Sequence, residues 1–169
     1  MAILEQIDES LSQLLKKRKA IKISSYLDDR SVSFLNVESR DLAIEKLVSH
    51  LHKHGRLIDK DLFHKAILER EKIVSTGIGM GVSIPHAKLP DFKEFFIAIV
   101  IQKEKAIEWN ALDKAPVRLI FMIGGPEDKQ NEYLQILSKL TQVIKNESLR
   151  KQIVGAKSAK DVIKLLSPF

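Results

Sequence analysis

The sequence predicts an α/β protein with a single folded domain. Two segments, 95–102 and 117–123, are dense in Ile, Val and Phe, as strands buried on both faces are. Several longer segments instead repeat their apolar residues at helical spacing. The chain has 169 residues, which suits one domain with its own core and is short for two.

The N-terminal segment predicts an amphipathic helix over residues 3–18. Its apolar residues lie at helical spacing, with acids early and bases late, as the helix dipole favours. We expect this extra helix, residues 1–19, to pack on the domain of residues 20–169 or on a second copy of the chain, rather than on a membrane or nucleic acid.

The first half of the domain predicts one strand and two helices. Residues 31–36 alternate apolar and polar side chains, which is typical of a short strand. A helix follows over 40–53, with Ser39 as its cap and Gly55 beyond its end. A second helix begins near residue 59 or 60 and ends at Ile73.

The second half begins with an irregular segment, 75–88, where we expect a glycine-rich loop. The strands 95–102 and 117–123 come next, and the run Gly124-Gly125-Pro126 is expected to break the second of them. Helical patterns occupy the rest of the chain, at about 129–145, 147–154 and 159–166.

Composition and charge exclude several classes of protein. The absence of cysteine rules out disulfide scaffolds, thiolate zinc sites, iron–sulfur clusters and cysteine nucleophiles. The net charge of +6 permits nucleic acid as a partner, but the excess is spread along the chain and suits an acidic protein at least as well. No apolar run approaches the roughly 20 residues of a membrane helix. We therefore expect a cytoplasmic protein without a membrane partner and do not expect nucleic acid binding.

His50 and His54 are one candidate metal pair, because i, i+4 spacing places them on one helix face. Zinc needs further ligands, and none is evident nearby. We therefore expect a solvated helix end there and no metal.

His86 is the strongest candidate for chemistry. It follows Pro85 at the end of the glycine-rich segment, whose spacing matches neither common nucleotide-binding pattern. The glycines let backbone N–H groups approach an anion, and Pro85 restricts the backbone before His86. The imidazole could be a metal ligand, a general base or a nucleophile. If it attacks a phosphoryl group, the product needs a cation, and Arg70 offers a guanidinium.

Several short motifs between residues 70 and 137 can be compared with known families. They are Arg70-Glu71, Ser75-Thr76-Gly77-Ile78-Gly79, Gly81, Ile84-Pro85-His86, Trp109-Asn110-Ala111-Leu112-Asp113, Pro116-Val117, Leu134 and Leu137. With these motifs the chain resembles enzyme IIA domains of the fructose–mannitol class of the bacterial phosphoenolpyruvate-dependent phosphotransferase system, with the nitrogen-regulatory branch most similar. The resemblance covers about residues 20–166.

The resemblance implies a mixed β-sheet flanked by helices and a phosphocarrier site without a cofactor. His86 matches the residue that a histidine phosphocarrier protein phosphorylates, and Arg70 matches the arginine that steadies the phosphoryl group. Tyr133 stands where the family usually has a second histidine, and a phenol cannot become a cation near neutral pH. We expect the phosphate cradle to comprise the backbone amides of Thr76, Gly77, Gly79 and Gly81.

The expected function is a phosphotransferase component that carries a covalent phosphohistidine and does not turn over a substrate by itself. We favour a regulator whose partners depend on its phosphorylation state. One alternative is a sugar-uptake subunit that passes the phosphoryl group to an enzyme IIB. The other is a binding module for an acidic protein or nucleic acid in which His86 is never phosphorylated.

Overall fold

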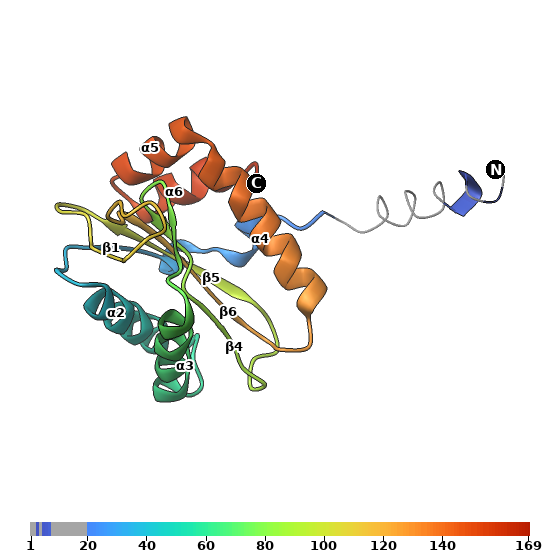
Figure 1. Ribbon diagram of the computed structural model, residues 1–169, viewed down its shortest axis with the longest axis horizontal. Coiled ribbons are helices and arrows are strands. Elements are labelled where there is room, and N and C mark those ends of the chain that lie inside the picture. Colours follow the sequence, from blue (N-terminus) through green and yellow to red (C-terminus); the bar gives the residue numbers. More distant parts are fainter. Residues whose placement is uncertain (1–2, 4, 8–19) are drawn as a thin grey trace.

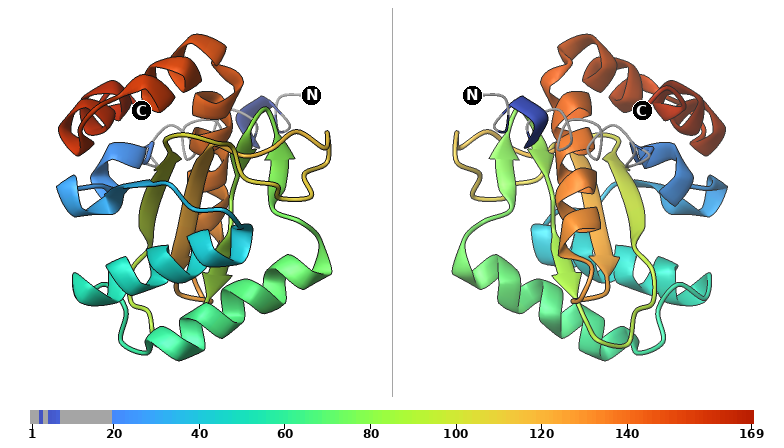
Figure 2. Two further views of the ribbon diagram at one scale, coloured as in Figure 1. Left: turned by 90° about the vertical axis from the view of Figure 1, so that its left-hand side faces the viewer. Right: turned by 90° about the vertical axis from the view of Figure 1, so that its right-hand side faces the viewer.

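A six-stranded sheet lies between two layers of helices (Figures 1 and 2). The computed structural model describes residues 3, 5–7 and 20–169, so most of the helix expected over residues 3–18 lies outside the described residues. The division into residues 1–19 and a domain of 20–169 stays a prediction. Within the described residues, no helix has both the length and the apolar character needed to cross a membrane.

The sheet is mixed, as the resemblance implied. Its strand order is β1-β5-β6-β3-β2, with β4 also paired to β6. Antiparallel pairing joins β5 to β6 and β2 to β3, whereas β1 is parallel to β5, and β3 and β4 are both parallel to β6. The strands are β1 (Val32–Leu35), β2 (Gly77–Gly79), β3 (Val82–Ser83), β4 (His86–Lys88), β5 (Phe96–Gln102) and β6 (Leu119–Gly125).

The helices form two layers because β5 and β6 are apolar on both faces (Figure 1). Alternate residues of these strands pack either with α2 and α3 or with the helices that follow β6. Two short 3₁₀ helices, η1 and η2, precede β1. The bounds are η1 (Ile23–Tyr26), η2 (Asp29–Ser31), α2 (Arg40–Lys53), α3 (Lys60–Ile73), α4 (Gln130–Lys145), α5 (Glu147–Gly155) and α6 (Ala159–Leu166).

Side-chain caps set the starts of four helices. The side chains of Ser39, Asp59, Asn146 and Ser158 each accept a hydrogen bond from a backbone N–H three residues further on. These caps explain why the helix bounds agree closely with those predicted from the sequence.

The segment 75–88 is not the loop predicted from its glycines. It contains β2, β3 and β4, which are each two or three residues long. Strands this short show no alternating pattern, and they form here because β3 and β4 both pair with β6.

The prediction that Gly124-Gly125 breaks the second long strand is also wrong, because β6 continues through Gly125. Two aromatic rings occupy the space that side chains would need. A Cβ on Gly124 would lie 2.4 Å from Phe96 Cζ, and one on Gly125 would lie 2.1 Å from Phe95 Cδ1.

We predict that Gly125→Ala lowers the free energy of unfolding by about 1–3 kcal/mol, because the buried Phe95 ring must move to admit a methyl group. Gly155→Ala is the matched control, since a Cβ there has no neighbour within 4 Å. It should change stability by less than about 1 kcal/mol. Urea denaturation measures both, and equal effects would show that Phe95 does not restrict Gly125.

Candidate functional site

His86 is the first residue of β4, where the strand beside β6 resumes after an interruption. The interruption is the pair Ile84-Pro85, since Pro85 has no N–H and a restricted φ. The backbone on both sides is nevertheless held. Ile84 N donates to the Thr76 carbonyl at 2.9 Å, and Ile123 N donates to the Pro85 carbonyl at 3.0 Å. This edge of the sheet therefore fixes the position of His86.

A hydrogen bond to the backbone sets the tautomer of His86. Its Nδ1 lies 2.9 Å from the Ile84 carbonyl oxygen. Because a carbonyl oxygen only accepts, Nδ1 carries the proton, and in the neutral ring Nε2 has the free lone pair. Nε2 is therefore the nitrogen able to act as a nucleophile.

The surroundings of His86 keep its imidazole neutral. Burial lowers its pKa below the usual value of 6.5, and the positive charges of Arg70 and Lys88 lower it further. The hydrogen bond to Ile84 and the charge of Glu71 act in the opposite direction without reversing the shift. The lone pair on Nε2 is therefore available at neutral pH.

Arg70 lies in the last turn of α3, where its Nη1 donates to the Val74 carbonyl at 2.8 Å. This bond uses one of the five donors of the guanidinium. The charge of Arg70 lowers the pKa of His86 and also opposes the raised pKa of Tyr133, so it acts on both rings. The structure thus brings Arg70 into the electrostatic environment of the predicted site.

Tyr133 lies beside His86, although the two residues come from α4 and β4. Their ring centroids are 5.9 Å apart, and the Tyr133 ring stacks on Phe95 at 6.1 Å. Tyr133 is only 7% exposed, and burial raises the pKa of its phenol. The Tyr133 side chain is therefore neutral and buried, and it packs next to the imidazole.

Lys88 belongs to the same group, and the sequence analysis missed it. Its Nζ lies 4.4 Å from the centre of the Tyr133 ring and donates to Gln130 Oε1 at 2.7 Å. The two-residue spacing from His86 on a strand was the available signal, because it places both side chains on one face.

A buried carboxylate to which the sequence analysis gave no role joins three parts of the chain. Glu71 is 4% exposed, and its Oε2 accepts from Thr76 N at 3.1 Å. Its Oε1 accepts from the Thr76 hydroxyl and from Trp109 Nε1. These bonds tie the end of α3, next to Arg70, to the start of β2 and to the segment before β6.

The expected phosphate cradle is not one continuous group of free amides. Thr76 N donates to Glu71, and Gly77 N donates to Ser75 Oγ at 3.1 Å. Gly81 also lies far from His86 along β6. The Gly81 carbonyl accepts from Leu119 N, whereas His86 is paired with Ile123, four residues further along that strand. Four residues of a strand span about 13 Å. Gly79 and Gly81, with φ of +100° and +75°, instead lie on either side of Met80 where the chain turns from β2 to β3.

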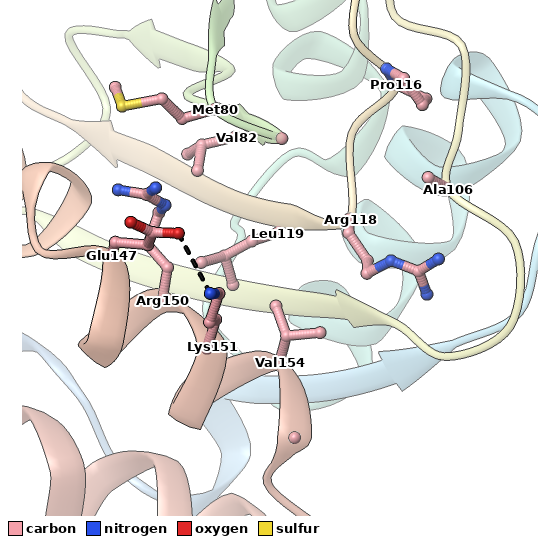
Figure 3. A pocket seen from close by; sticks show the side chains of 12 residues that line it. Met80, Val82, Ala106, Pro116, Arg118, Leu119, Glu147, Arg150, Lys151 and Val154 are labelled. Carbon is pink, nitrogen blue, oxygen red and sulfur yellow. Dashed lines mark ion pairs between the residues drawn. The ribbon is translucent and has the colours of Figure 1, made fainter.

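The cavity of about 600 Å³ in Figure 3 lies at that distant end, between the β2–β3 turn and α5. Its lining includes Gly81, Val82 and Leu119 but neither His86 nor Arg70. The cavity is therefore separate from the candidate site.

The His50 and His54 rings lie edge to face, 4.4 Å apart. His50 Nε2 is 2.8 Å from the Arg30 carbonyl oxygen and so carries a proton. Over the described ranges 3, 5–7 and 20–169, no three His, Asp or Glu residues are grouped so as to hold a metal ion.

The fold matches that of a solved nitrogen regulatory protein. The crystal structure of nitrogen regulatory protein IIA-Ntr from Neisseria meningitidis superposes with a TM-score of 0.78 at 30% identity, covering 85% of this chain and 98% of that one. Residues 25–168 match the family model described as "Phosphoenolpyruvate-dependent sugar phosphotransferase system, EIIA 2". The chain belongs to this family.

Two fructose-specific relatives are also similar. The fructose-specific EIIA component of Haloferax volcanii is 35% identical over 129 residues, which are 76% of this chain and 83% of that protein. The fructose-specific EIIABC component of Bacillus subtilis is 36% identical over 149 residues. That match covers 87% of this chain, which spans only 23% of the longer Bacillus protein.

We predict that the His86 resonances titrate below 6.5 in an NMR pH series, because burial opposes protonation. The unfolded chain then takes up a proton first as the pH falls, so this residue makes the folded state less stable below about pH 6.5. His86→Gln should remove that part of the pH dependence in urea denaturation. A pKa for His86 at or above 6.5 would contradict the prediction.

Proposed function

We propose that the chain is a phosphocarrier in which His86 Nε2 accepts a phosphoryl group from a histidine phosphocarrier protein. The observation that carries this proposal is the bond between His86 Nδ1 and the Ile84 carbonyl, because it leaves the lone pair on Nε2. Membership of the EIIA family supports it. The chain then works as a component of a relay, not as an enzyme with turnover of its own.

The transfer moves one group between two imidazole rings. The Nε2 lone pair attacks phosphorus, and the electron pair of the broken P–N bond returns to the ring nitrogen of the donor. His86 Nδ1 keeps its proton and its bond to Ile84 throughout. Phosphoryl transfer needs mainly positioning and charge stabilisation, which the held imidazole and the Arg70 guanidinium supply.

We propose a regulatory role, in which the phosphorylation state selects the partners of the chain. The similarity to the Neisseria nitrogen regulatory protein supports it. A second candidate is transfer to an enzyme IIB, supported by the higher identity, 35% and 36%, to two fructose-specific relatives. Mixing the phosphorylated chain with a fructose-specific enzyme IIB distinguishes the two, because only the second role gives rapid transfer. We place both roles in the cytoplasm, the compartment that supplies phosphoenolpyruvate.

We predict that phosphoenolpyruvate, enzyme I and the phosphocarrier protein together add one acid-labile phosphoryl group to the chain. Intact-mass measurement detects it, and His86→Gln should abolish it. His64→Gln is the matched control and should be labelled like the parent. If the parent is not labelled, the chain is a binding module and the proposal fails; labelling of His86→Gln would move the site to another residue.

We predict that Arg70→Lys slows phosphorylation at least tenfold, about 1.4 kcal/mol of transition-state stabilisation. The planar guanidinium can bind two phosphoryl oxygens at once, whereas an ammonium is a point charge. Arg40→Lys, on the first turn of α2, makes the same change at an exposed ion pair and should leave the rate unchanged. A rate within twofold of the parent for Arg70→Lys would show that the guanidinium does not contact the phosphoryl group.

A further inference from the structure

Lys88, Tyr133 and Gln130 form a connected group beside His86. The Lys88 ammonium lies over the face of the Tyr133 ring, 4.4 Å from its centre, and donates to Gln130 Oε1 at 2.7 Å. The Tyr133 ring is in turn 5.9 Å from the His86 ring. The Lys88 side chain is thus held by two residues of α4 next to the nucleophile.

The pleat of β4 directs Lys88 toward the same side as His86. Ala87, between them, packs in the core with α2 and α3. Its two neighbours therefore face the opposite side of the sheet, where Tyr133 lies. The positive charge of Lys88 already acts on His86, since it lowers the pKa of that imidazole.

The charge on the phosphoryl oxygens explains why a second cation stabilises the site. These oxygens share nearly two negative charges near neutral pH. The imidazole, which keeps its Nδ1 proton, has one positive charge, but that charge lies on the ring and makes no hydrogen bond to the oxygens. Arg70 supplies one cation that can reach the oxygens. Tyr133 supplies none, because its phenol is neutral and burial raises its pKa further. Lys88 is a second cation beside the site, and the bond to Gln130 uses only one of its three donors.

We propose that Lys88 is the second cation of the phosphoryl site and that Tyr133 and Gln130 are positioning residues for its ammonium. This inference rests on the proposed function. When His86 Nε2 is phosphorylated, Lys88 Nζ donates to a phosphoryl oxygen while the Tyr133 ring keeps the ammonium beside His86 through a cation–π contact. Tyr133 thus contributes through the π face of its ring, and its hydroxyl is not needed for this role.

The test compares variants of Lys88 in single-turnover phosphorylation at saturating donor. Lys88→Gln should slow the reaction about tenfold, as expected for loss of one charge-assisted hydrogen bond. Lys88→Arg should stay within about threefold of the parent, because it keeps the charge. Lys93→Gln, at an exposed lysine on the next loop, changes the net charge equally and should match the parent.

A spectroscopic measurement separates a contact with the phosphoryl group from docking of the donor protein. A nearby cation favours the dianion, so the second pKa of the phosphoryl group, followed by ³¹P NMR, should rise in Lys88→Gln and not in Lys93→Gln. Tyr133→Phe should leave both the rate and this pKa unchanged, whereas Tyr133→Leu should change both in the direction of Lys88→Gln.

The outcomes separate this inference from the proposed function. If the parent chain accepts no phosphoryl group, the proposed function itself fails. If the parent is phosphorylated and folded Lys88→Gln matches it in rate and in phosphoryl pKa, Lys88 is not the second cation, while His86 and Arg70 keep their roles. A slower Tyr133→Phe would instead assign the contact to the phenol hydroxyl and overturn the positioning role.

Discussion

Strand β6 is the element on which the arrangement depends, because three other strands pair with it. One edge binds β5, and the other is shared by β3 and β4, which lie one after the other. The break between them falls at Ile84-Pro85. The Ile84 carbonyl is therefore free to accept from the side chain of His86. The interruption of an edge strand thus fixes both the position and the tautomer of the histidine.

The location of the site at this edge follows from the layered fold. Arg70 comes from α3 and Tyr133 from α4, and these helices cover opposite faces of the sheet (Figure 1). Residues of opposite layers approach each other only where the sheet ends. The buried Glu71 carboxylate secures this meeting point, since its bonds to Thr76 and Trp109 hold the end of α3 against β2. The loss of one of those partners would leave the buried carboxylate with fewer hydrogen bonds and so destabilise this contact.

Helices α2, α3, α5 and α6 could be predicted from the sequence within one or two residues, because capping side chains mark where they begin. Helix α4 has no such cap and was predicted from the helical spacing of its apolar residues. The two long strands could be recognised because both of their faces are buried. The glycines misled the analysis twice. Those of 77–81 hide the short strands β2 and β3, of which β3 pairs with β6 and β2 pairs with β3. Gly124 and Gly125 make room for Phe96 and Phe95 instead of ending a strand. In both cases the decisive contact is distant in the sequence.

The candidate site, like the fold, could be predicted from the sequence only in part. His86 and Arg70 lie in a local motif, and the position of Tyr133 follows from the resemblance, so their approach was expected. Lys88 is marked in the sequence only by its two-residue spacing from His86, and Glu71 only by its place beside Arg70, because their contacts come from α4 and from Trp109. The proposed function gives these charges a consequence. Before phosphorylation this edge presents the cations Arg70 and Lys88, and the phosphoryl oxygens then place nearly two negative charges beside them. A partner with an acidic surface then distinguishes the two states by charge alone, and no movement of the backbone is required.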